Sequence, residues 1–105
     1  MTIMGVVIKN GKIDSVKGKK IEEILLEDLC AVIIDDVKNK IYIWSGSKAN
    51  VKDRFIASRL AHGLNAKIFG LAGTVEQNAT KIKDELSEKV IEEDVSLELI
   101  KSIIG

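Results

Sequence analysis

The sequence has no proline, one cysteine and one histidine in 105 residues. A single cysteine cannot form an internal disulfide, and with one histidine it does not supply the ligands of a zinc site. No apolar run approaches the ~20 residues that a membrane span needs. Lys9, Asn10 and Lys12 interrupt the first apolar run too early for a signal peptide. We therefore expect a cytoplasmic protein in which Cys30 is a free, buried thiol.

An excess of charge of either sign is also missing, because 16 basic residues balance 16 acidic ones. This balance argues against a nucleic acid or a membrane as a partner recruited by net charge. Signals of catalysis are absent too. His62 has no nucleophile-elbow pattern near it in the sequence, and the Gly70–Gly73 spacing lacks the lysine of a phosphate loop. We expect no enzyme and no required cofactor.

The composition predicts one compact domain over residues 1–105, since 46% of the residues are hydrophobic and 30% are charged. Asn10-Gly11 between two β-rich runs predicts a hairpin with a primed turn. Residues 30–34 form a continuous apolar run typical of a central strand covered on both faces. Residues 41–44 follow after a short polar turn, which predicts an antiparallel partner strand.

The second half of the sequence predicts mainly helices. Apolar residues recur with helical spacing over residues 50–64, and residues 66–71 read as a short strand. Thr74 to Gln77 fits a capping box that opens a helix reaching about Glu93. Asp94 or Ser96 is expected to cap a last helix. The expected fold is α+β: a small mixed, mostly antiparallel sheet packed between a long helix and additional C-terminal helices.

The long helix carries a second apolar stripe, opposite its predicted core face. The stripe has the spacing i, i+4, i+7, i+11 and consists of Val51, Phe55, Ser58 and His62. Phe55 is then exposed to water unless something covers it. The C-terminal helices, or burial of the helix on two sides, are one way to cover it. A partner protein that receives the helix in a groove is the other.

The central segment resembles a gelsolin-like domain. The resemblance rests on an apolar strand ending in Asp35, an Ile41-Tyr42-Ile43-Trp44-Ser45-Gly46 strand and an amphipathic helix, and it covers residues 25–69. It implies a sheet between a long and a short helix, and non-catalytic binding of actin or an actin-like protein. The residues that it places in the actin cleft are Val51, Phe55, Ser58, Arg59 and His62.

Two features depart from the family pattern. Calcium-binding members use one carboxylate at the start of the central strand and one on the long helix. Asp53 matches the helix acid, but Cys30 occupies the strand position and Asp28 lies two residues upstream. A thiol is a poor ligand for a hard cation, so we expect a weak calcium site at Asp53 and Asp28, or none. Residues 74–105 are the second departure, an atypical helical extension that folds back on the sheet, covers the long helix or pairs with a second copy as a homodimer.

The sequence thus favours a single gelsolin-like domain that regulates assembly of actin or an actin-like protein, by monomer binding or end capping. The alternative is a scaffold or dimerisation module of the same fold that does not bind actin. A weaker alternative is an unrelated α+β interaction domain.

Overall fold

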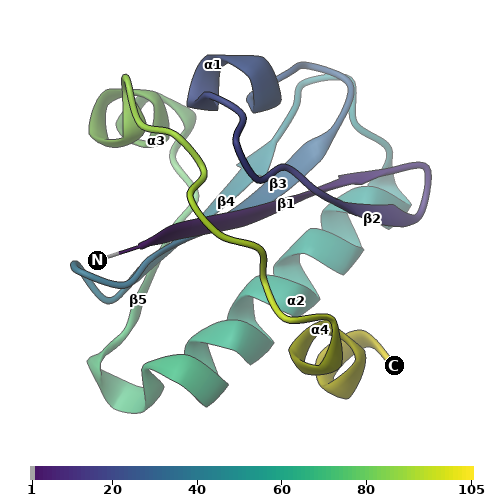
Figure 1. Cartoon of the computed structure of the whole chain (residues 1–105). Helices are drawn as coiled ribbons and strands as arrows, with labels where there is room; N and C mark the ends of the chain where they lie inside the picture. Colours follow the sequence, from purple (N-terminus) through teal and green to yellow (C-terminus); the bar gives the residue numbers. More distant parts are fainter. Residues whose placement is uncertain (1) are drawn as a thin grey trace.

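The structure of the protein is a computed structural model that describes residues 2–105. Five strands form one sheet in the order β2-β1-β3-β4-β5 (Figure 1). The strands are β1 (Ile3–Lys9), β2 (Lys12–Ser15), β3 (Cys30–Asp35), β4 (Lys40–Ser45) and β5 (Thr74–Glu76). Neighbours among the first four strands are antiparallel, and β5 is parallel to β4. The expected mixed, mostly antiparallel sheet is confirmed.

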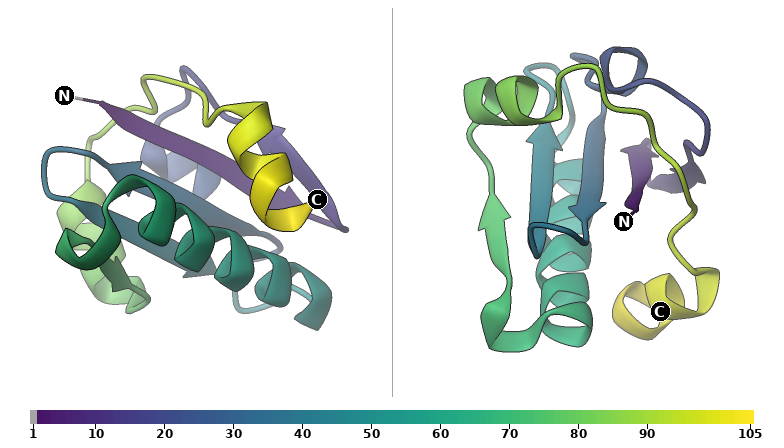
Figure 2. Two further views of the ribbon diagram at one scale, coloured as in Figure 1. Left: turned by 90° about the horizontal axis from the view of Figure 1, so that it is seen from below. Right: turned by 60° about the vertical axis from the view of Figure 1, so that its left-hand side comes forward.

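Helices cover both faces of the sheet (Figure 2). The long helix α2 (Val51–Ile68) and the last helix α4 (Leu97–Ile104) lie on one face, and α1 (Ile21–Ile24) and α3 (Ala79–Leu86) lie on the other. Side chains of β3 alternate between the two layers, so that Val32 packs with the α2 layer and Ile33 with the α1–α3 layer. Residues 30–34 are buried, as the sequence predicts, and Asp35 at the end of β3 is buried as well.

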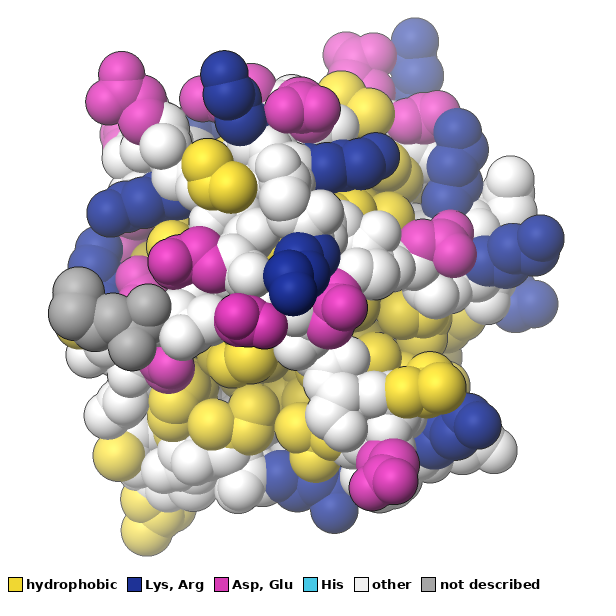
Figure 3. All heavy atoms as spheres, viewed as in Figure 1, with side chains coloured by type: hydrophobic (Ala, Val, Ile, Leu, Met, Phe, Trp, Pro, Cys, Tyr) yellow, Lys and Arg dark blue, Asp and Glu magenta, His cyan; other side chains and the backbone are white. Residues whose placement is uncertain are grey.

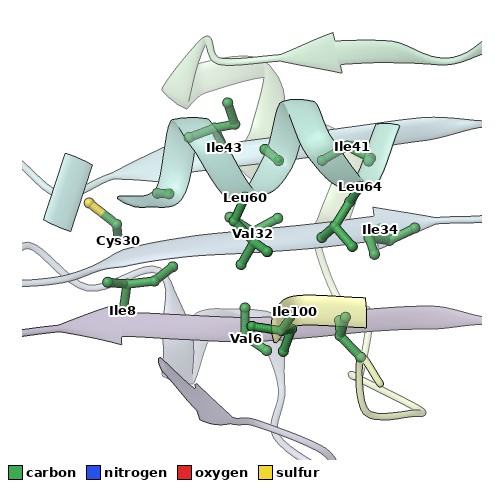
Figure 4. Packing of buried hydrophobic residues seen from close by; sticks show 13 residues of the cluster. Val6, Ile8, Cys30, Val32, Ile34, Ile41, Ile43, Leu60, Leu64 and Ile100 are labelled. Atoms are coloured by element: carbon green, nitrogen blue, oxygen red, sulfur yellow. The ribbon is translucent and has the colours of Figure 1, made fainter. Parts of the chain in front are cut away.

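The core beneath α2 is built from aliphatic side chains of β1, β3 and β4 (Figure 4). Leu60 and Leu64 of α2 point onto Val32 and Ile34 of the central strand, and Ile100 of α4 packs beside Val6. Leu60 and Leu64 have no solvent exposure. Burying a leucine side chain contributes ~1.5–3 kcal/mol, so these residues fix which side of α2 faces the sheet.

The first β-hairpin, between β1 and β2, has the turn geometry that the sequence predicts. Asn10 and Gly11 have φ angles of 52° and 81°, the left-handed values that a primed two-residue turn requires. The turn between β3 and β4 also contains a left-handed residue, Asn39, with φ of 52°. Asn tolerates this region better than most residues with a Cβ atom.

The strand expected at residues 66–71 is wrong, because α2 continues to Ile68 and the 3-10 helix η1 (Gly70–Ala72) follows. A short apolar run does not distinguish a strand from a buried helix turn. Gly63 lies inside α2, although a glycine is common at the end of a helix. A Cβ atom at Gly63 would lie 2.5 Å from Cγ2 of Ile103, so this glycine makes room for α4 against α2. The helix ends before Gly70, whose φ of 59° is typical of a residue beyond a helix C-terminus.

The capping box expected at Thr74 is wrong as well. Residues 74–76 are strand β5, which pairs with β4 in the register Ile41 to Val75. Asn78 caps α3 instead, since its side chain accepts a hydrogen bond from the Lys81 amide at 3.0 Å. The helix ends at Leu86 rather than near Glu93. The extension expected at residues 74–105 is therefore not helical throughout. Its first part forms strand β5 and helix α3.

Two polar contacts join α3 to β4. Glu85 accepts a hydrogen bond from the Lys40 ammonium at 2.7 Å and one from the Tyr42 hydroxyl at 3.1 Å. The Lys40 hydrogen bond lowers the pKa of Glu85, whereas burial and the nearby Glu85 charge raise the pKa of Tyr42. Tyr42 has no solvent exposure. The short helix α3 is thus held over the sheet by charge as well as by Ile82 and Leu86.

The segment between α3 and α4 carries the chain from one face of the sheet to the other. Ile91 packs in the α1–α3 layer, and Val95 packs in the α2–α4 layer. Between them, the Glu92 amide donates to the Ile3 carbonyl at 2.8 Å, beyond the point where β2 stops pairing with β1. Ser96 caps α4, as one of the two expected caps. Among residues 2–105, no helix is long and apolar enough to cross a membrane.

Candidate partner-binding face

The residues around Trp44 fix where α2 begins. The Trp44 indole donates to the Leu26 carbonyl at 2.8 Å and lies in the α1–α3 layer. A Cβ atom at Gly46 would lie 2.2 Å from the Glu27 carbonyl oxygen. Gly46 is therefore required by the close approach of two backbone segments. The chain leaves β4 at this contact and reaches the start of α2 within a few residues.

The first turn of α2 is held by side-chain hydrogen bonds. Asn50 is the N-cap, and its side chain accepts from the Asp53 amide at 2.8 Å. Arg54 reaches back to the loop before the helix, where its guanidinium donates to the Gly46 carbonyl at 2.9 Å and the Ala49 carbonyl at 3.2 Å. These bonds fix the helix relative to the sheet, so its exposed side has a defined orientation.

Asp53 joins the start of α2 to the β1–β2 hairpin. Its two carboxylate oxygens accept hydrogen bonds from the backbone amides of Asn10 and Gly11, both at 2.8 Å. Asp53 is only 1% exposed. A buried carboxylate needs such partners to offset the loss of its hydration. The negative charge near a helix N-terminus also favours the helix dipole.

The two carboxylates expected for a weak calcium site have partners within the domain. Both oxygens of Asp53 already bind backbone amides, and Asp28 forms an ion pair with Lys9 at 2.7 Å. The pKa of Asp28 is lowered chiefly by that Lys9 hydrogen bond. Cys30 is fully buried, and burial raises the pKa of its thiol. Within residues 2–105, no cluster of three or more His, Cys, Asp or Glu side chains is arranged to hold a metal ion.

The predicted stripe on α2 lies on the side of the helix that faces away from the sheet. Phe55 is 67% exposed and Val51 is 82% exposed. Arg59 and His62 are exposed beside them, and Ser58 is half-buried. Neither α3 nor α4 covers Phe55, because α3 lies on the opposite face of the sheet and α4 packs beside α2 at Gly63. We call Val51, Phe55, Ser58, Arg59 and His62 the α2 face.

The C-terminal residues largely fold back on the domain itself. Ile82, Leu86 and Ile100 are buried, whereas Leu97 stays 63% exposed. In the view of Figure 3, charged side chains of both signs cover the upper half of the surface, and apolar side chains gather in the lower half. Of the three arrangements expected for the extension, folding back on the sheet describes most of its apolar residues.

Sequence reasoning did not predict the contacts that position α2. Arg54 acts on carbonyl groups seven and eight residues earlier, at Ser47 and Gly46. Asp53 acts on the turn at Asn10 and Gly11, more than 40 residues earlier. An acidic residue in the first turn of a helix is common, because its charge interacts favourably with the helix dipole. The position of Asp53 therefore did not indicate a contact with a distant turn.

Comparison with known proteins gives one sequence relationship. No family model matches the sequence. The chain is 41% identical over 46 residues to the macrophage-capping proteins of Homo sapiens and Rattus norvegicus. The match covers 44% of this chain, and the chain spans only 13% of the length of these relatives.

Two solved structures share the fold. The Thorarchaeota ProGel protein, solved in a crystal with rabbit actin, superposes with a TM-score of 0.64 at 19% identity, and the match covers 81% of this chain and 99% of ProGel. The Thorarchaeota 2DGel3 protein, also solved with rabbit actin, gives a TM-score of 0.59 at 18% identity over 88% of this chain and 48% of that one. The chain thus has the gelsolin-like α+β fold expected from its sequence.

Proposed function

We propose that the protein binds actin or an actin-like protein through the α2 face and thereby regulates its assembly, without catalysis. The observation that carries the proposal is Phe55, an aromatic side chain 67% exposed on a helix that is fixed at its N-terminus. The two structural neighbours were both solved in complex with rabbit actin, and the sequence relative is named a capping protein. Because actin is cytoplasmic, the proposal implies a cytoplasmic location.

The α2 face has the composition of a protein–protein contact. Phe55 is the central residue, because aromatic side chains that become fully buried often dominate such interfaces. Val51 lies one turn before Phe55, and His62 lies about two turns after it, so both extend the apolar contact along the helix. Arg59 is placed at the rim, and the half-buried Ser58 lies between the face and the body of the domain.

The proposed activity is monomer binding or end capping. Residues 2–105 contain one such helix, and one helix fills one cleft. Bridging or severing a filament benefits from two linked contacts, since the second contact then forms at high effective concentration. Calcium is not needed for the proposed contact, because Asp53 and Asp28 are already bound within the domain.

The test is an actin polymerisation assay with wild type, Phe55→Asp and a control. We expect wild type to slow polymerisation and Phe55→Asp to lose this effect, because an aspartate cannot replace the buried ring. The matched control is Val37→Asp, which places the same charge at a 58% exposed apolar residue in the turn between β3 and β4. Equal inhibition by wild type and both variants, or no inhibition by wild type, would refute the proposal.

A scaffold or dimerisation module is the second candidate, and one observation favours it. A groove of about 300 Å³ lies beside the edge strand β2, lined in part by Ile13, Leu97 and Ile100. Leu97 is 63% exposed there. Light scattering at high protein concentration distinguishes the candidates, since a monomer that inhibits actin polymerisation contradicts the dimerisation module.

A further inference from the structure

The neutral net charge of the chain conceals a local excess of positive charge on α2. Helix α2 contains four basic residues and a single acidic one, Asp53. Residues 76–98, which include α3 and most of the segment that leads to α4, contain eight acidic and three basic residues. The sheet separates α2 from α3 (Figure 2), so the positive helix and the acidic segment lie mainly on different sides.

The charge of α2 is not compensated locally. Asp53 is buried, and its oxygens bind backbone amides. The four basic residues are Lys52, Arg54, Arg59 and Lys67, and within residues 2–105 none of them forms an ion pair. By contrast, the acidic side chains Glu76, Glu85 and Glu93 pair with lysines elsewhere in the domain. Helix α2 therefore carries an excess of positive charge that no ion pair offsets.

Two of these cations lie beside the proposed apolar contact. Lys52 and Arg59 are seven residues apart, which puts them within about 20° of each other around the helix. Phe55 lies between them in sequence and about 40–60° away from them around the helix, by the same geometry. Both side chains are exposed, and the Lys52 ammonium extends towards Gly11 of the hairpin turn. An apolar strip bordered by a cationic row thus runs along the first three turns of α2.

We propose that the partner surface which receives α2 is an apolar cleft bordered by carboxylates, and that Lys52 and Arg59 steer its association. This inference rests on the proposed function and adds the chemistry of the partner to it. Opposite charge at the rim of an interface raises the association rate more than the final affinity. The potential of a few exposed charges extends over about 8 Å at physiological salt. The same attraction favours an approach in which α2 faces the cleft.

The test measures association and dissociation rates with rabbit actin held monomeric, over a range of salt concentrations. The double variant Lys52→Glu/Arg59→Glu reverses the cationic row. The control variant Lys19→Glu/Lys89→Glu has the same net charge, but its changes lie between α1 and the segment after α3. All four side chains are exposed, and unfolding temperatures check that both variants keep the fold.

We expect the Lys52/Arg59 variant to associate at least ~10-fold more slowly than wild type at low salt, with the difference shrinking as salt rises. The control should stay within ~3-fold of wild type at every salt concentration. Equal association rates and equal salt dependence for the two variants would overturn the inference. Binding that Phe55→Asp abolishes but charge reversal leaves unchanged refutes the inference and keeps the proposed function. If wild type does not bind actin, the proposed function fails and the inference fails with it.

Discussion

The hydrogen bonds of Asp53 predict a large loss of stability on Asp53→Ala. The carboxylate binds the Asn10 and Gly11 amides, both at 2.8 Å, at a site that is 1% exposed. A hydrogen bond to a charged group contributes ~1.5–3 kcal/mol, and the charge near the helix N-terminus adds ~0.3–1 kcal/mol. Removing the side chain also removes the cost of burying a charge, so we expect a net loss of ~3–5 kcal/mol.

Urea unfolding at neutral pH measures this loss, because a domain of this size has a total stability of only ~5–15 kcal/mol. Asp53→Asn should lose less, since its amide oxygen still accepts from one of the two backbone groups. Amide hydrogen exchange gives a local check, as the Asn10 and Gly11 amides should exchange faster in both variants. A loss below ~1 kcal/mol for Asp53→Ala, with both amides still protected, would contradict the assigned role of this carboxylate.

Two further predictions concern other parts of the domain. Gly46→Ala should lower the free energy of unfolding by ~2 kcal/mol or more in a urea titration, because its Cβ atom would lie 2.2 Å from the Glu27 carbonyl oxygen; an unchanged midpoint would show that the backbone moves apart freely. Glu85→Gln should reduce the acid sensitivity of stability. The Lys40 hydrogen bond lowers the pKa of Glu85. The contribution of the ionised Glu85 carboxylate to stability is therefore complete above the unfolded pKa of ~4.3. It is lost as pH falls through the lower pKa of the folded state. Urea midpoints between neutral and acidic pH should fall less steeply for Glu85→Gln than for wild type, and parallel curves would contradict the prediction.

Local sequence signals predicted the first half of the fold well. The Asn10-Gly11 turn, the buried strand β3 and its partner β4 each follow from the identity of neighbouring residues. The second half was predicted less well, because its structure depends on distant contacts. Thr74 reads as a helix cap, yet it pairs with Lys40 of β4 in the sheet. Gly63 reads as a helix end, yet it is retained inside α2 because Ile103 packs against it.

Four residues of the α2 face could be predicted from spacing and Arg59 only from the family resemblance, whereas the support and the charge of the face could not be predicted. Helical spacing places Phe55 on a different side of α2 from the core residues, so its exposure could be predicted. The contact of Asp53 with the hairpin joins residues far apart in the chain, so no local pattern contains it. Counting charges over the whole chain gives zero and hides the cations of α2. The structure shows that these cations share one helix with Phe55 and have no ion pairs.

The path of residues 87–96 around the edge of the sheet has a practical consequence for experiments. Because this path brings α4 to the layer of α2, any peptide or fluorescent protein fused after Gly105 emerges on the side where binding is proposed. Such a fusion would hinder the approach of a large partner and imitate a loss of affinity. Labels for imaging or pull-down assays are better attached at surface lysines of α3, behind the sheet.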